Sequence, residues 1–157
     1  MPPTSSTALT ASRAAGSWRE YSCRPPHDDR APVVVRGWIA GLLGGLAQSL
    51  GEGLALVATE LVTNAVWHGA VPTRVSLSLT DDGPGVRVRL EVEDGGAGFD
   101  FNKVRPAGAD SPAGADSLAC GGRGLCIVAA LACDWGNVRA AGRHVVWAEL
   151  TTGGLEG

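Results

Sequence analysis

Two segments in the middle of the chain alternate apolar and polar residues almost without exception. Residues 73–80 contain the run RVSLSLT, residues 86–93 contain VRVRLEV, and DDGPG joins them. Strict alternation is typical of a strand that buries one face and exposes the other. Because the linker is short and contains Gly and Pro, the two strands are predicted to form an antiparallel hairpin.

The rest of the chain is predicted to add helices and further strands to this hairpin. Apolar residues recur at helical spacing in three segments, and shorter β-like runs occur near both ends. The predicted helices cover residues 33–50, 51–67 and 124–131, and the predicted strands cover residues 18–23, 134–140 and 144–151. Antiparallel hairpins with helices gathered on one face define an α+β fold in two layers.

One domain of residues 18–152 is expected, with a disordered tail at 1–17 and a short tail at 153–157. Residues 94–122 are irregular and contain PAGADS twice in tandem, at 106–111 and 112–117, which indicates a mobile loop.

Composition excludes several functional classes. The chain has 157 residues, a formal net charge of −3 and a pI near 5.5, which argues against a nucleic-acid-binding face. We find neither a secretory signal nor an apolar segment long enough to span a bilayer, so we expect a cytoplasmic protein that does not bind membranes. The four cysteines lack metal-ligand spacing and are expected to be reduced: Cys23, Cys120, Cys126 and Cys133.

The first candidate site cluster is ELVTNAVWHG, residues 60–69. Glu60 and Asn64 are four residues apart and therefore project from the same side of the second helix, with His68 one turn later. An amide oxygen can ligate Mg²⁺ and a carboxylate can accept a proton, so the pair suits chemistry on a polyphosphate. A solvated helix face with ordinary polar residues is the alternative interpretation.

Two glycine-rich clusters follow. In DGGAG, residues 94–98, Asp94 stands at a strand end next to backbone that can approach a ligand closely, although Asp-Gly is also common in tight turns. In GGRGL, residues 121–125, glycines open a helix whose N-terminus can bind an anion, and Arg123 can add a charge-assisted contact. A flexible start to that helix is the alternative.

In this order, the three clusters resemble the N, G1 and G2 boxes of the GHKL ATPase superfamily, which includes gyrase, heat-shock chaperones, histidine kinases and MutL. The segments ELVTNAVWHG, DGGAG, GGRGLCIVAALACDWG and VVWAEL are most similar to its small stand-alone branch, the anti-sigma-factor-like serine/threonine kinases. The resemblance covers about residues 18–151. It implies a two-layer α/β sandwich of the Bergerat type, with a mixed, mainly antiparallel sheet and helices on one face.

The resemblance also implies roles for individual residues. Asn64 would bind the Mg²⁺ that bridges the ATP phosphates, Glu60 would be the general base, and Asp94 would accept a hydrogen bond from the adenine amino group. Residues 99–120 would be the ATP lid. The remaining nucleotide-binding residues would be Gly96 and Gly98 beside the nucleotide and Gly122, Arg123, Gly124 and Leu125 at the phosphates.

Two further expectations concern side chains near the nucleotide. Lys103, Arg105 or Arg123 could cover the terminal phosphate. A Thr often stands in the last strand of this branch where the present chain has Val145 or Val146, so an adenine-side hydroxyl is expected to be missing.

The function implied by the resemblance is phosphate transfer from Mg-ATP to an antagonist protein, combined with sequestration of a sigma factor. A homodimer is common in this branch. Two alternatives stay open: an ATP-responsive binding switch without turnover, and a degenerate interaction module that binds no nucleotide.

Overall fold

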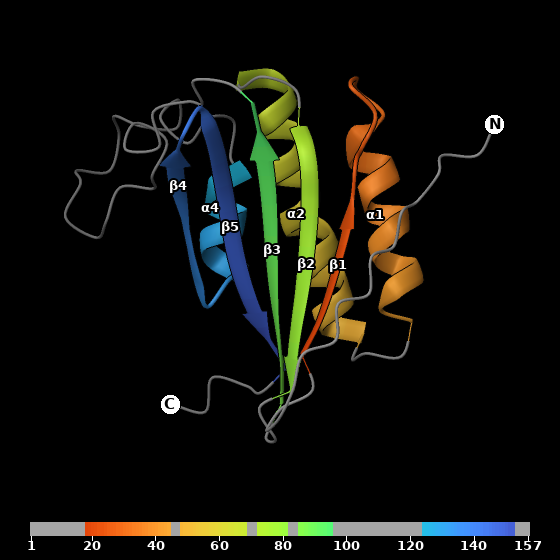
Figure 1. Ribbon diagram of the computed structural model, residues 1–157. Coiled ribbons are helices and arrows are strands. Elements are labelled where there is room, and N and C mark those ends of the chain that lie inside the picture. Colours follow the sequence, from red (N-terminus) through yellow and green to blue (C-terminus); the bar gives the residue numbers. More distant parts are fainter. Residues whose placement is uncertain (1–17, 45–47, 69–71, 82–84, 96–123, 153–157) are drawn as a thin grey trace, which may run out of the picture.

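The computed structural model describes residues 18–44, 48–68, 72–81, 85–95 and 124–152 (Figure 1). Several sequence-based predictions lie outside these residues. They are the two tails, the PAGADS repeats, the lid at 99–120, and the site candidates Lys103, Arg105, Gly96, Gly98, Gly122 and Arg123, together with Cys120.

The described strands form one five-stranded sheet in the order β1-β2-β3-β5-β4. Each strand is antiparallel to its neighbours, so the parallel pairing that a mixed sheet allows is not found among the described strands. The predicted hairpin is confirmed as β2–β3, and β3 extends one residue further than predicted, to Asp94. The strands are β1 Trp18–Cys23, β2 Pro72–Asp81, β3 Val86–Asp94, β4 Asp134–Ala140 and β5 Arg143–Thr151.

The described helices are α1 Ala31–Leu42, α2 Gln48–His68 and α4 Gly124–Leu131. Pro32 lies in the first turn of α1, where its missing N–H is no loss. The predicted first helix, residues 33–50, is wrong at its end: α1 stops at Leu42, and the segment around Leu50 belongs to α2. Glycines at and around this boundary weaken a helix because they lose more conformational entropy than other residues.

The helices cover one face of the sheet, which confirms the two-layer α+β fold (Figure 1). α2 packs on β2, β3 and β5, while α1 and α4 flank α2. The predicted apolar stripe of α2 is buried, and so is every second residue of β3 and β5. The largest fully buried apolar side chains of the core are Ile39, Leu54, Leu61, Leu77, Leu90 and Leu125.

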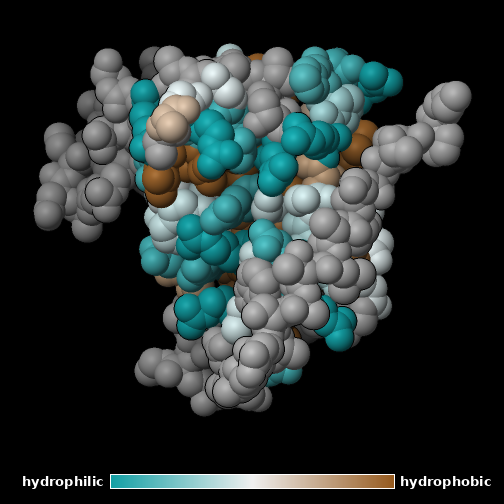
Figure 2. Space-filling model, in the orientation of Figure 1, coloured by the Kyte–Doolittle hydropathy of each residue, from teal (hydrophilic) through white to brown (hydrophobic). Residues whose placement is uncertain are grey.

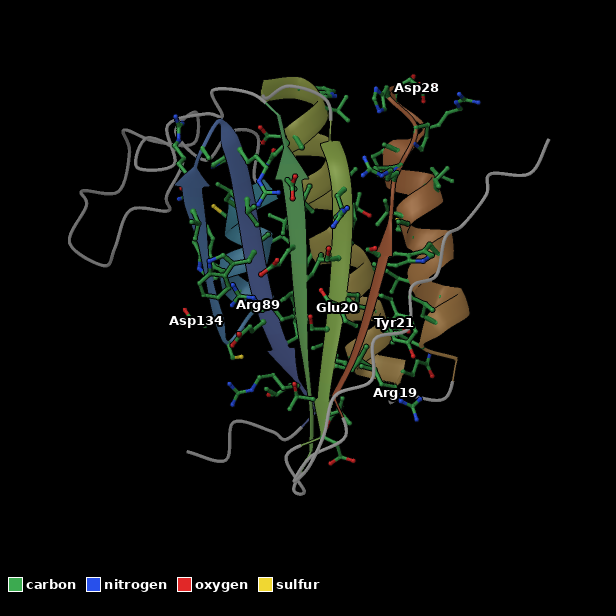
Figure 3. The ribbon with its side chains drawn as sticks, in the orientation of Figure 1. Arg19, Glu20, Tyr21, Asp28, Arg89 and Asp134 are labelled. Carbon is green, nitrogen blue, oxygen red and sulfur yellow. The ribbon has the colours of Figure 1, made fainter. Side chains whose placement is uncertain are left out.

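The opposite face of the sheet carries charged residues around an aromatic ring. The guanidinium of Arg89 (Figure 3) lies 4.1 Å from the ring centre of Trp147. It also donates to Glu91 at 2.8 Å and to Glu149 at 3.0 Å. In the same orientation, hydrophilic residues gather on this face (Figure 2). Alternation along β3 and β5 therefore separates an apolar, helix-covered face from a polar one.

A tight turn joins β4 to β5. Ala140 pairs with Arg143, so only Ala141 and Gly142 lie between the strands. Both have positive φ, 48° for Ala141 and 75° for Gly142, as a type I′ turn requires. Gly142 is thus in the turn as predicted, and this turn fixes where β5 begins. No helix within the described part of the chain has the length and apolar character needed to cross a membrane.

Candidate functional site

Five elements, α2, β2, β3, β5 and α4, begin or end at one end of the sheet (Figure 1). Only residues 69–71 separate the last residue of α2 from Pro72, and Pro72 is paired with Asp94 at the end of β3. Asp94 in turn is paired with His144 at the start of β5. α4 also begins at this end. It is followed directly by β4, and β4 starts at the opposite end of the sheet (Figure 1). The C-terminal half of α2, Asp94 at the end of β3 and Gly124 at the start of α4 therefore lie at the same end of the sheet.

Asp94 is the last residue of β3, and its side chain is only 1% exposed. It continues the row of buried side chains at Val88, Leu90 and Val92, so it points to the helix-covered face. An isolated carboxylate is costly to bury, because it loses its hydration. A carboxylate in this place therefore needs a donor from the protein or from a ligand.

The protein supplies a hydrogen-bond partner for Asp94 in His144, a residue that the sequence did not single out. Nδ1 of His144 lies 3.0 Å from Oδ2 of Asp94, and His144 is 0% exposed. The sequence analysis considered two neighbouring positions of this strand, Val145 and Val146, because one of them is where the resembling kinases often have a Thr. Val146 is on the same buried face of β5 as His144, whereas Val145 is on the other face and only partly buried. Strand alternation back from Val146 was the signal that could have identified His144.

Glu60 and Asn64 occupy the C-terminal half of α2. Asn64 is only 7% exposed, so the alternative of a solvated helix face is wrong at this position. Glu60 is half-buried, and its burial raises the pKa of the carboxyl group, since the charged form loses hydration. A raised pKa makes the carboxylate of Glu60 a stronger base than a fully hydrated glutamate. His68 is the last residue of α2, one residue beyond the predicted end at residue 67.

The third cluster is only partly described. Gly124 is the first residue of α4, which confirms that the glycine-rich segment leads directly into a helix. The side chain of Leu125 is 0% exposed and belongs to the apolar core. Any contact of Leu125 with a nucleotide would therefore come from its backbone, not from its side chain.

These residues fit a magnesium-bound adenine nucleotide. The adenine amino group is a donor, and Asp94 is a buried acceptor at the sheet end. Mg²⁺ takes oxygen ligands and is commonly held by one or two protein groups together with substrate phosphates, which suits the amide oxygen of Asn64. The N-terminus of α4 offers backbone N–H groups and a favourable dipole for phosphate. Within the described ranges, no group of three or more His, Cys, Asp or Glu residues is arranged to hold a metal ion by itself.

Comparison with known protein families agrees with this geometry. The family model of the histidine kinase-like ATPase domain matches residues 26–149, which is most of the chain. The chain therefore belongs to the histidine kinase-like ATPase family, and ATP is the nucleotide that this membership implies. The GHKL resemblance of the sequence is confirmed.

Among solved structures, the fold is similar to the crystal structure of the RsbU and RsbW domains of Rv1364c from Mycobacterium tuberculosis. The TM-score is 0.58 at 20% sequence identity, and the match covers 83% of this chain and 32% of that one. The chain thus spans about a third of the length of this structural relative. At this identity the likeness concerns the fold. A comparison with curated proteins gave no match.

Proposed function

We propose that this protein binds Mg-ATP at the described sheet end and acts as a regulatory serine/threonine kinase of the anti-sigma-factor-like branch. The observation that carries the proposal is the buried carboxylate of Asp94 at the end of β3, at the same end of the sheet as the half of α2 that contains Glu60 and Asn64. A buried acceptor suits the base, an amide oxygen suits the metal ion at the phosphates, and a carboxylate suits the removal of a proton from the attacking hydroxyl.

Each residue has a separate task in this proposal. Asp94 accepts a hydrogen bond from the adenine amino group and so orients the base. Asn64 contributes an oxygen ligand to Mg²⁺, which neutralises charge on the phosphates. Backbone N–H groups at the start of α4, with Gly122 and Arg123 before it, hold phosphate oxygens. Glu60 accepts the proton of the attacking Ser or Thr hydroxyl.

The proposed partners follow from the resemblance of the motifs to the anti-sigma-factor-like kinases. One partner is a sigma factor that the protein sequesters, and the other is an antagonist protein whose Ser or Thr receives the phosphate. The fold likeness to a structure that contains an RsbW domain supports this choice of branch. Homodimerisation, a cytoplasmic location and residues 99–120 as the lid belong to the same proposal.

Calorimetric titration with Mg-ATP tests the site. The wild type should bind saturably, and Asp94→Asn should weaken binding at least about tenfold, because the substitution removes the negative charge and replaces one of the two acceptor oxygens with an NH₂ donor. Asn64→Ala should make the affinity insensitive to Mg²⁺ between excess metal and EDTA. A folded wild type that gives no heat with Mg-ATP would overturn the proposal, and so would an unchanged Asp94→Asn affinity.

Glu60→Gln separates catalysis from binding. This variant should keep its Mg-ATP affinity but transfer radiolabelled γ-phosphate to the cognate antagonist about 10²–10⁴-fold more slowly. Equal transfer rates for the wild type and the variant would remove Glu60 as the base. If the wild type binds Mg-ATP yet transfers no phosphate to its antagonist, the protein is an ATP-responsive switch instead of a kinase.

A further inference from the structure

The histidine beside Asp94 gives the adenine end of the site a second functional residue. We propose that His144 is a positioning residue that holds Asp94 as a hydrogen-bond acceptor and thereby makes the site select ATP over GTP. This inference rests on the proposed nucleotide site. It goes beyond that site because it assigns base selectivity to a pair of residues, one of which has no counterpart in the sequence motifs.

The fold forces the two side chains together. Asp94 and His144 are paired in the β3–β5 ladder, and both lie on the helix-covered face. The two-residue turn of Ala141 and Gly142 leaves β5 no freedom to shift its register by one residue without exposing His144 and burying Arg143. The contact of 3.0 Å between Nδ1 and Oδ2 is thus a consequence of the backbone arrangement.

The direction of this hydrogen bond decides what Asp94 can offer a ligand. An ionised carboxylate only accepts, so the imidazole donates its Nδ1–H to Oδ2. A carboxylate has capacity for several hydrogen bonds, so the bond to His144 does not by itself prevent Asp94 from accepting one from a ligand. His144 therefore stabilises Asp94 in its acceptor form inside a nearly dry environment, where a carboxylate without a donor is strongly disfavoured.

An acceptor at this position distinguishes the two purine bases. Adenine carries an amino group at C6, which donates, whereas guanine carries an oxygen there, which accepts. Guanine would place two acceptors against each other in a buried site. A buried site that is built to hydrogen-bond one ligand rejects an analogue that leaves its polar groups unpaired. The preference for ATP over GTP should therefore depend on His144, which keeps Asp94 a hydrogen-bond acceptor.

The test compares Mg-ATP and Mg-GTP affinities by calorimetry for the full chain and two variants. His144→Asn retains an N–H donor at about the position of Nδ1 and should keep the ATP affinity within about threefold. His144→Leu has similar bulk but no donor. It should lose about 10–100-fold in ATP affinity, as expected for a hydrogen bond to a charged group, and its ATP-to-GTP preference should shrink. Near-UV circular dichroism checks that both variants fold.

A double-mutant cycle with Asp94→Asn measures whether the two substitutions affect ATP affinity through each other. A purely structural role of His144 would give no such coupling. If His144 acts through Asp94, His144→Leu should lower the ATP affinity of the Asp94→Asn background by less than threefold. Full additivity of the two effects would overturn the inference. The inference would also be overturned if His144→Leu kept the wild-type ratio of ATP affinity to GTP affinity. The same holds if His144→Asn lost as much ATP affinity as His144→Leu. A wild type that binds no Mg-ATP would instead refute the proposed function itself.

Nitrogen-15 NMR of the histidine side chains tests the hydrogen bond in the wild-type protein itself. The chain has three histidines, and His144→Asn identifies the resonances of His144. We expect a proton on Nδ1 of His144 in the nucleotide-free protein and in the complex with ADP. A neutral ring with its proton on Nε2 in both states would overturn the inference, because Nδ1 could then only accept.

Discussion

Asp94 and His144 face each other from the end of β3 and the start of β5, with Oδ2 and Nδ1 3.0 Å apart and both side chains buried. Fifty positions separate them in the sequence. What aligns them is the β4–β5 turn, where Ala141 adopts a φ of 48° and Gly142 one of 75°. The site thus depends on a turn that contains one residue poorly suited to its backbone conformation, because a Cβ atom disfavours the left-handed region.

Ala141→Asn should stabilise the protein. Asn followed by Gly is the preferred pair for a type I′ turn, since Asn tolerates positive φ better than Ala does. We expect the free energy of unfolding to rise by about 0.5–1 kcal/mol, measured by urea denaturation. Ala40→Asn is the matched control: Ala40 is exposed in α1, where Asn is the poorer helix former and should lower stability by about 0.5 kcal/mol. Stability changes of the same sign in both variants would contradict the assignment of strain to Ala141.

Glu60→Gln should change how stability depends on pH. Burial raises the pKa of Glu60 in the folded protein, so the folded state holds this proton to higher pH than the unfolded state does. Stability contributed at Glu60 therefore falls as pH rises from the ordinary glutamate pKa through the raised one. The glutamine variant lacks this loss and should gain stability relative to the wild type as pH rises.

Urea midpoints of wild type and variant between pH 4 and pH 8 measure this difference. Glu52→Gln is the control, because Glu52 is exposed on the same helix, where it accepts a hydrogen bond from Gln48. A Glu60→Gln advantage that is constant across this pH range would show that burial at Glu60 does not perturb its titration. Together with the phosphate-transfer assay, these midpoints test whether the half-buried carboxylate of Glu60 both lowers stability and accelerates the reaction.

Local sequence patterns were sufficient for most of the fold. Alternation in RVSLSLT and VRVRLEV predicted β2 and β3 to within one residue at each end, and the apolar spacing around Leu125 predicted α4. The boundary between α1 and α2 was missed because apolar residues at helical spacing continue past Leu42. The spacing of apolar residues predicts which face of a helix is buried, but it does not predict where glycines end the helix.

The candidate site was predictable in part for a related reason. Glu60 and Asn64 share a helix, so their spacing alone places them together. Asp94 was found because glycines follow it. His144 stands in no motif, and its importance arises only from strand pairing across β3 and β5. Such a contact depends on register, which local patterns do not determine when the two strands are far apart in the sequence.

Cys23 and Cys133 should react with thiol reagents at very different rates. Cys23 packs against the core at the end of β1, and burial raises its pKa to about 11, whereas Cys133 is exposed. Only the thiolate is nucleophilic, so Cys23 should react at least about 100-fold more slowly with iodoacetamide at pH 7.5. Peptide mass spectrometry after timed quenching measures both rates. In concentrated urea the two rates should converge, and equal rates in the native protein would refute the protection of Cys23.

Gly136→Ala should destabilise the polar face of the sheet. A Cβ atom at Gly136 would lie 3.1 Å from Cζ2 of Trp147, closer than ordinary contact. The ring cannot move away without loosening its contact with Arg89, whose guanidinium is also held by Glu91 and Glu149. We expect a loss of about 1–3 kcal/mol in the free energy of unfolding, as for other overpacked sites.

Gly37→Ala makes the same glycine-to-alanine change but should have the opposite effect on stability. Gly37 is exposed in the middle of α1, and a Cβ atom there would meet nothing within 4 Å. Alanine is the better helix former, so this variant should gain about 0.5–1 kcal/mol. Urea denaturation of both variants should therefore give shifts of opposite sign. If Gly136→Ala also gains stability, the ring of Trp147 is free to yield, and the stack of Arg89 on Trp147 does not hold the strands β3, β5 and β4 in a fixed arrangement.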